Sequence, residues 1–179
     1  PEENKHWSEL EKKGAYNSPL LILDLDSTVS INSISVKQKD YRSYRVKSDG
    51  SVALAVTGIV SSEGKVLLGK RSSNNYQYPS SYDCVPAGSL EDSDYINQLN
   101  QEWKEETGSE ISVSWGGESM LILSHLDKVL DIVVKGRVTS LDIKSLKSNE
   151  FDEFRWFDKN DENCMTPLTQ SLNVLSVIS

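Results

Sequence analysis

Short apolar stretches separated by polar turns run along most of the chain, a pattern typical of a protein rich in β-strands. Two of them, residues 52–60 and 65–68, flank the turn sequence Ser61-Ser62-Glu63-Gly64, which predicts a hairpin. In all, we predict strands at residues 20–23, 29–36, 52–60, 65–68, 82–85, 111–115, 119–125, 129–138 and 153–157.

Helical periodicity is confined to fewer segments. We predict helices at residues 6–13, 40–46 and 94–107, and a terminal helix that Thr166 caps and Pro167 starts. Trp7 and Leu10 share one face of the first helix, and Leu99 and Trp103 share one face of the third. Because strands outnumber helices in this order, we expect a single α+β domain with a mixed or antiparallel sheet.

The charge balance narrows the classes of partner. Lys and Arg number 19 against 27 Asp and Glu, and the formal net charge of −8 argues against nucleic acid polymers and anionic membranes. No apolar run reaches the length of a membrane span, and no signal peptide is evident. Cys84 and Cys164 lack the spacing of a zinc site or a disulfide framework. We therefore expect a cytoplasmic protein.

Three glutamates carry the main chemical signal. Glu102, Glu105 and Glu106 lie at positions i, i+3 and i+4 of the helix predicted at 94–107, so their carboxylates share one side. Such crowding usually marks a solvated helix face, but it also suits a hard divalent cation such as Mg²⁺.

Residues around the glutamates favour the metal site. Gly88, Asp94, the three glutamates and Gly108 resemble the Nudix box, whose pattern is G-x(5)-E-x(7)-R-E-U-x-E-E-x-G-U with U aliphatic. The resemblance covers roughly residues 50–178 and implies a mixed β-sheet sandwiched between helices. It implies a Nudix hydrolase domain at 47–179, preceded by an N-terminal helix and β extension at 1–46. It also implies that Glu102, Glu105 and Glu106 bind Mg²⁺ or Mn²⁺, with Glu105 also taking part in catalysis.

The box, residues 88–109, departs from the family pattern at several positions. Asp94 stands where the family has Glu, and the following spacer is one residue short. Gln101 replaces the usual Arg; it can hydrogen-bond Glu102 but brings no positive charge. Ser109 replaces the last aliphatic residue, whose pocket Ile111 could fill. These departures concern the residues of the expected chemistry more than those of the fold.

The resemblance suggests further site residues outside the box. Arg71 resembles a family Arg that reaches a substrate phosphate, and Glu150 or Glu153 resembles an acid that orients water, so either is a candidate base. The alternative interpretation of Glu150 and Glu153 is that they belong to a charged loop that leads into a strand. Tyr76, Tyr78 and Tyr82 could stack on a base, with Tyr78 favoured, although packing is the commoner use of such residues.

The family splits nucleoside diphosphates linked to many groups. The extension is similar to those of nucleotide-sugar and ADP-ribose members, which use added strands for dimerisation or base recognition, so we favour such a nucleotide-derived substrate and a homodimer. The alternative is a catalytically weak Nudix module that binds a nucleotide or a protein.

A competing motif lies at residues 20–29. Asp24 and Asp26 in the sequence LLILDLDSTV resemble the first motif of haloacid dehalogenase-like phosphatases, in which one Asp is the nucleophile. Ser124, Asp127 and Asp131 imitate later motifs, but they lie too close together for the helices that should separate them. We interpret the motif as coincidence in a strand and turn.

Overall fold

The structure, a computed structural model, describes residues 2–12, 15–24, 33–46, 49–75, 77–117, 119–125 and 127–158. Within these ranges the strands are β1 (Pro19–Leu23), β2 (Val36–Asp40), β3 (Ala53–Ser62), β4 (Lys65–Arg71), β5 (Tyr82–Cys84), β6 (Ala87–Ser89), β7 (Ser114–Trp115), β8 (Met120–Ser124), β9 (Val129–Arg137) and β10 (Phe151–Asp158). The helices are α1 (Glu2–Glu11), α2 (Tyr41–Val46), α3 (Tyr95–Thr107) and the 3-10 turn η1 (Ile143–Ser145). None of the described helices is long and apolar enough to cross a membrane.

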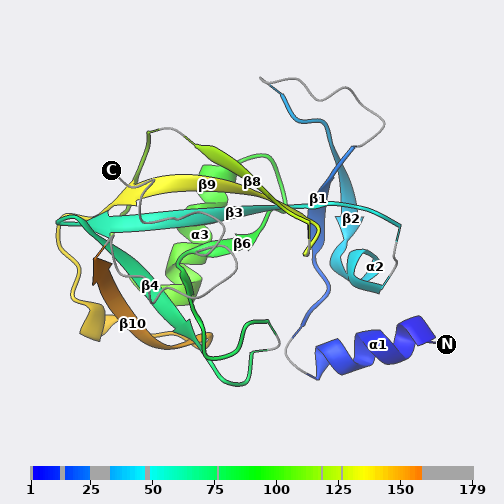
Figure 1. Ribbon diagram of the computed structural model, residues 1–179, viewed down its shortest axis with the longest axis horizontal. Coiled ribbons are helices and arrows are strands. Elements are labelled where there is room, and N and C mark those ends of the chain that lie inside the picture. The colour runs from blue at the N-terminus through cyan, green and yellow to red at the C-terminus, as the bar shows by residue number, and fades with distance from the viewer. Residues whose placement is uncertain are drawn as a thin grey trace.

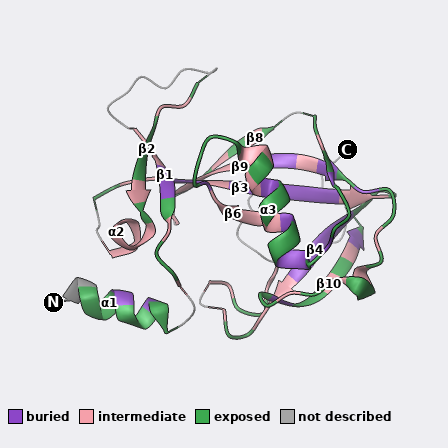
Figure 2. Ribbon diagram, turned by 180° about the vertical axis from the view of Figure 1, so that it is seen from behind, coloured by how far each residue is buried: buried purple, intermediate pink, exposed green. Residues whose placement is uncertain are grey.

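Strand β3 is the centre of the sheet (Figure 1). It pairs in parallel with β9 along its whole length and antiparallel with β1, β4 and β6. A parallel pair needs a long crossover, and the chain between β3 and β9 includes α3, which lies against the sheet (Figure 2). The expected α+β class with a mixed sheet is thus confirmed.

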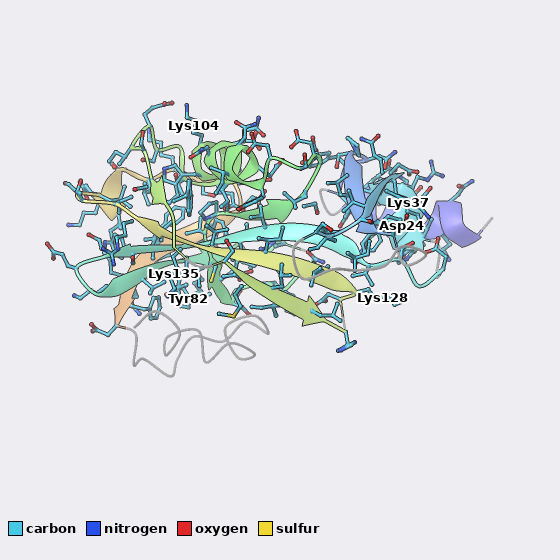
Figure 3. The ribbon with its side chains drawn as sticks, turned by 90° about the horizontal axis from the view of Figure 1, so that it is seen from above. Asp24, Lys37, Tyr82, Lys104, Lys128 and Lys135 are labelled. Atoms are coloured by element: carbon cyan, nitrogen blue, oxygen red, sulfur yellow. The ribbon has the colours of Figure 1, made fainter. Side chains whose placement is uncertain are left out.

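The two faces of the sheet bury different residues. Leu99 of α3 packs with Leu54, Val56 and Val134, and Trp103 packs with Val60, Leu67 and Val85. The other face is formed by Ile59, Val66, Leu68, Cys84, Val133 and Phe157, with Tyr82 packed against them. Figure 3 shows α3 with Lys104 on one side of the sheet and Tyr82 on the other. Side chains of successive strand residues therefore point alternately towards α3 and away from it.

The N-terminal extension lies at one end of the molecule (Figure 1). Antiparallel strands β1 and β2 extend the sheet beyond β3. The Leu21 amide donates to the Leu90 carbonyl at 2.7 Å, which joins β1 to the loop before α3. Buried Trp7 of α1 meets the Tyr41 ring of α2 edge-on, with centroids 6.3 Å apart. The extension is therefore attached close to the box.

Most predicted elements are confirmed, including α1 with Trp7 and Leu10 buried, the helical turn α2, and α3. Four details differ. The strand predicted at residues 111–115 spans only Ser114–Trp115. In the described part of residues 29–36, β2 begins only at Val36, and β6 was not predicted. Ile111 is 41% exposed, and buried Val113 packs with Trp103 instead. Residues 25–32 and the predicted terminal helix lie outside the described ranges.

Candidate active site at the α3 cleft

An open cleft of about 590 Å³ brings together segments that are distant in the sequence. The lining residues are Ala15, Tyr16, Ser18 and Tyr41 of the extension, Arg71 at the end of β4, Asn75 and Gln77 after it, Ala87 to Ser89 of β6, Glu91, Gln98, Gln101, Glu102, Glu105 and Glu106 of α3, and Asn149 and Glu150 before β10. All three predicted metal ligands, Arg71 and Glu150 therefore share one cleft.

Glu106 is the most buried of the three glutamates, with 5% of its surface exposed. Its Oε2 accepts a hydrogen bond from the Ala87 amide at 3.2 Å. Burial, followed by the charges of Glu102 and Glu150, raises its pKa well above the usual range, while the Ala87 bond and Arg71 oppose the rise. A carboxylate in such a place gains from a nearby cation.

Glu102 is held over the box glycine. Its Oε1 accepts a hydrogen bond from the Gln98 side chain at 2.8 Å, one helical turn earlier. A β-carbon at Gly88 would overlap this carboxylate, so only glycine leaves it room. Burial raises the pKa of Glu102 to about 7, with contributions from Glu105 and Glu150 and an opposing one from Gln98. Gln98, not the expected Gln101, is thus the hydrogen-bond partner, because residues four apart face each other on a helix.

The carboxylate oxygens at the cleft are the type of ligand that Mg²⁺ and Mn²⁺ bind. Three carboxylates of α3 border the cleft, two of them with raised pKa values, and Gly88 leaves space for the Glu102 carboxylate. Across the described ranges, however, no three His, Cys, Asp or Glu side chains already enclose a position for an ion. Mg²⁺ commonly uses one or two carboxylates with water and phosphate oxygens as its other ligands, so the residues present fit it.

Arg71 is oriented by three contacts. Its Nε donates to the Gln77 carbonyl at 3.1 Å, and its Nη1 pairs with Asp83 Oδ2 at 3.3 Å. Its guanidinium carbon lies 5.9 Å from the centre of the Phe151 ring. The guanidinium remains close enough to Glu106 to oppose the rise of that residue's pKa. A cation therefore lies at the end of β4, beside the glutamates.

The backbone of Glu150 is fixed on both sides. Its amide donates to Ser148 Oγ at 3.0 Å, and its carbonyl accepts from the Ser72 amide at 2.8 Å and from Asn75 Nδ2 at 3.1 Å. After burial, the charge of Glu150 contributes to raising the pKa values of Glu102 and Glu106, and all three residues line the cleft. Ser148 and Asn75 were not singled out in the sequence because capping side chains have no distinctive spacing.

Two other predicted site residues lie elsewhere. Glu153 Oε1 lies 3.7 Å from Arg155 Nε. Burial, followed by the charge of Glu153, raises the pKa of Tyr82, whose ring packs on the face away from α3. The Tyr78 hydroxyl donates to Asp127 at 2.9 Å, and neither residue lines the cleft. Burial first, and then this bond, raises the pKa of Tyr78 to about 12. Tyr78 thus ties its loop to the turn before β9, an arrangement that its position in the sequence could not reveal.

The variant positions of the box also have structural roles. Asp94 accepts a hydrogen bond from the Asn97 amide at 3.0 Å and so caps α3 at its N-terminus. Gly108 adopts a left-handed conformation with φ 62° and ends the helix. Gln101 is exposed at the cleft. Although the spacer after Asp94 is one residue short, the three glutamates of α3 still line one cleft.

The competing phosphatase motif has a different setting. Asp24 follows β1 and pairs with Lys37 of β2 at 2.6 Å (Figure 3). This carboxylate does not line the cleft. Strand β1 runs antiparallel to both β2 and β3. Asp26 lies outside the described residues. The described part of the motif is thus the salt-bridged end of a hairpin.

Comparisons with known proteins bear on the fold. No family model matches the sequence, and no curated protein matches it. Among solved structures, DR0079 from Deinococcus radiodurans is 15% identical, covering 90% of this chain and 97% of its own, with a TM-score of 0.60. A Nudix hydrolase from Nitrosomonas europaea is 19% identical, covering 70% of this chain and 88% of its own, with a TM-score of 0.53.

A third solved structure contains a nucleotide ligand. The Nudix domain of NrtR from Shewanella oneidensis, in complex with ADP-ribose, is 13% identical, covering 70% of this chain and 86% of its own, with a TM-score of 0.54. Structural similarity at such low sequence identity shows that the backbones follow the same path. It does not show that the site residues are shared. The path of the sheet, with α3 against β3 and β6, is the Nudix fold, and the chain has that fold.

Proposed function

We propose that the protein is a metal-dependent pyrophosphohydrolase that cleaves the diphosphate of a nucleoside diphosphate linked to another group. The observation that supports it most is the convergence of three α3 carboxylates, Arg71 and Glu150 on one cleft. The Nudix fold adds support, and the ADP-ribose complex of the NrtR domain makes a nucleotide sugar or ADP-ribose the favoured substrate.

The chain's own groups have distinct tasks in this reaction. Glu102, Glu105 and Glu106 hold Mg²⁺ or Mn²⁺, which when bound supplies neutralisation of the diphosphate charge and activation of water. Arg71 binds a phosphate oxygen and keeps the diphosphate against α3. Glu150 accepts a proton from the attacking water. The water oxygen bonds to one phosphorus while the bond from that phosphorus to the bridging oxygen breaks, and two phosphate monoesters result.

The decisive test is hydrolysis of a substrate panel by the full chain with Mg²⁺ or Mn²⁺. The panel holds ADP-ribose, UDP-glucose, a dinucleoside polyphosphate and a nucleoside triphosphate, and products are separated by chromatography. We expect turnover of at least one diphosphate compound. Glu106→Gln should reduce it by about 100-fold or more, because the amide keeps the Ala87 bond but brings no charge to the metal.

Asp24→Asn is the matched control, since it also neutralises an acid but lies outside the cleft. Its turnover should stay within about two-fold of the unmodified chain. If Asp24→Asn abolished turnover while Glu106→Gln did not, the phosphatase interpretation would replace ours.

A catalytically weak binding module is the second candidate, and Gln101 is the observation that favours it. A neutral amide replaces the Arg of the family pattern beside the metal ligands, which can lower the rate without harming the fold. Binding of a panel compound by calorimetry without hydrolysis of any would establish this alternative.

A further inference from the structure

A short segment of the extension reaches the cleft. Residues 15–18, which we call the strap, connect α1 to β1, and three of them, Ala15, Tyr16 and Ser18, line the cleft that contains the glutamates. The strap is distant from the box in the sequence and belongs to no motif. Its presence at the glutamates is therefore a property that only the fold reveals.

The backbone of the strap is held at several points. The Ala15 amide donates to the Leu10 carbonyl at 3.0 Å, and the Ser18 carbonyl accepts from the Tyr41 amide at 2.8 Å. Between them, Asn17 Oδ1 accepts from the Arg42 amide at 2.8 Å. Helices α1 and α2 thus fix the strap on both sides of Tyr16.

The Tyr16 ring is left uncovered although its backbone is fixed. Tyr16 is 73% exposed, and it makes neither a hydrogen bond nor a ring contact with another residue of the described ranges. Partial burial, followed by the charges of Glu102 and Glu91, raises the pKa of its phenol. An aromatic ring that lines a cleft and has no protein partner leaves its face open to a planar ligand, and the fixed backbone limits the conformational entropy lost on binding.

Tyr41, the other aromatic residue among the cleft-lining ones, is already occupied. Its ring is within 6.3 Å of both the Trp7 and Tyr44 rings. Elsewhere the lining is mainly hydrogen-bonding or charged, as at Asn75 and Asn149, which suits sugar hydroxyls and phosphate oxygens. The flat, apolar part of a nucleotide is its base, so the base matches Tyr16 best.

We propose that Tyr16 is a specificity-determining residue that stacks on the base of the nucleotide whose diphosphate lies against α3. This inference rests on the proposed function. It assigns to Tyr16 the selection of nucleotides over diphosphates that have no base. Because stacking tolerates every base, Tyr16 sets a requirement for a base without choosing which one.

The test measures equilibrium binding of AMP, UMP and ribose 5-phosphate to the full chain in Mg²⁺ by calorimetry. Ribose 5-phosphate shares the sugar phosphate and lacks the base, so the ratio of affinities isolates the base. We expect the unmodified chain to prefer AMP and UMP, and Tyr16→Ala to reduce that preference by about 10-fold or more. Tyr16→Phe should keep it within about two-fold, since the ring remains.

Leu121→Ala is the matched control, because Leu121 of β8 is an exposed apolar residue, at 54%, that does not line the cleft. It should leave all three affinities unchanged. The inference is wrong if the unmodified chain shows no preference for the base, if Tyr16→Ala keeps that preference, or if Tyr16→Phe loses it. The binding measurements need no turnover. If no panel substrate were hydrolysed, the proposed reaction would be rejected, but the affinities would still show whether Tyr16 binds the base.

Discussion

Glu106 and Asp131 are carboxyl groups on opposite sides of one sheet; Glu106 is buried, and Asp131 is half-buried with its Oδ1 shielded from solvent. Glu106 belongs to α3, whereas Asp131 of β9 shares the other face with Val133, two residues along the strand. Burial raises both pKa values, that of Asp131 to about 7. By this measure alone, either group could be taken for a functional residue.

Their surroundings separate them. Glu106 borders an open cleft together with Glu102, Glu105 and the cation of Arg71. Asp131 does not line that cleft; its Oδ2 accepts a hydrogen bond from Thr57 at 3.0 Å, and its Oδ1 has no hydrogen-bond partner in the described part of the chain. A raised pKa therefore indicates a site only when other reactive groups and access to substrate accompany it.

Gly88→Ala tests the α3 face with the largest expected effect. The added β-carbon overlaps the Glu102 carboxylate, which is the movable end of a flexible side chain, so the fold survives but the carboxylate shifts. We expect hydrolysis of the panel substrate to fall by about 100-fold, comparable to the loss of a well-placed electrostatic group. Gly116→Ala is the control, since no atom lies within 4 Å of its added β-carbon. Equal rates for the two variants would contradict the role given to Glu102.

Asp131→Asn tests the other face through the pH dependence of stability. An acid whose pKa is raised in the folded state binds more protons folded than unfolded, so stability is full below its unfolded pKa and is lost as pH rises through the folded pKa. With a folded pKa of about 7, the unmodified chain should lose roughly 2–3 kcal/mol of unfolding free energy between pH 5 and 8 through Asp131.

Asparagine keeps the acceptor for Thr57 but cannot ionise, so Asp131→Asn should fall less steeply over the same pH range in urea unfolding followed by circular dichroism. Glu102 and Glu106 contribute in the same direction, so some decline remains. Turnover of the variant should be unchanged. Parallel stability curves would show that Asp131 does not ionise in this range, and a loss of turnover would show that the two faces are not functionally separate.

The same contrast explains how far the sequence predicted the site. The positions of Glu102, Glu105 and Glu106 followed from helical spacing, because local geometry determines which side chains share a helix face. Strands β3 and β4 were predicted from their apolar runs and the turn between them. These features depend on neighbouring residues alone.

Features that depend on distant residues were left open by the sequence or were not predicted. Glu150 and Glu153 are equally acidic in the sequence, but a register shift in β10 between Phe151 and Glu153 lies between them. Tyr16 could not be linked to the box, because only the attachment of the extension through Leu21 and Leu90 brings it there. Pairing of distant strands, and not local pattern, decides these positions.

Glu150→Gln and Glu153→Gln form a matched pair that sharpens the contrast. Glu150 lies at the cleft, and Glu153 lies on the face of Tyr82. We expect Glu150→Gln to lower kcat by about 100-fold, the lower end of the range for loss of a general base, with little change in KM. Glu153→Gln should stay close to the unmodified rate. The reverse result would move the base to the other face and overturn the assignment.

Gln98→Ala and Gln101→Ala probe the smallest expected effect, the support of Glu102 within α3. Gln98 donates to Glu102 Oε1 at 2.8 Å, whereas Gln101, at the position of the family Arg, is exposed. Loss of a hydrogen bond that orients a metal ligand typically costs about 10-fold in metal affinity or rate. We therefore expect Gln98→Ala to raise the Mg²⁺ concentration for half-maximal activity by about 10-fold and Gln101→Ala by less than about two-fold. Because alanine suits a helix at both positions, unequal effects reflect the Glu102 contact and not helix stability. If Gln101→Ala had the larger effect, the residue at the family's Arg position would still be the one that orients the ligand.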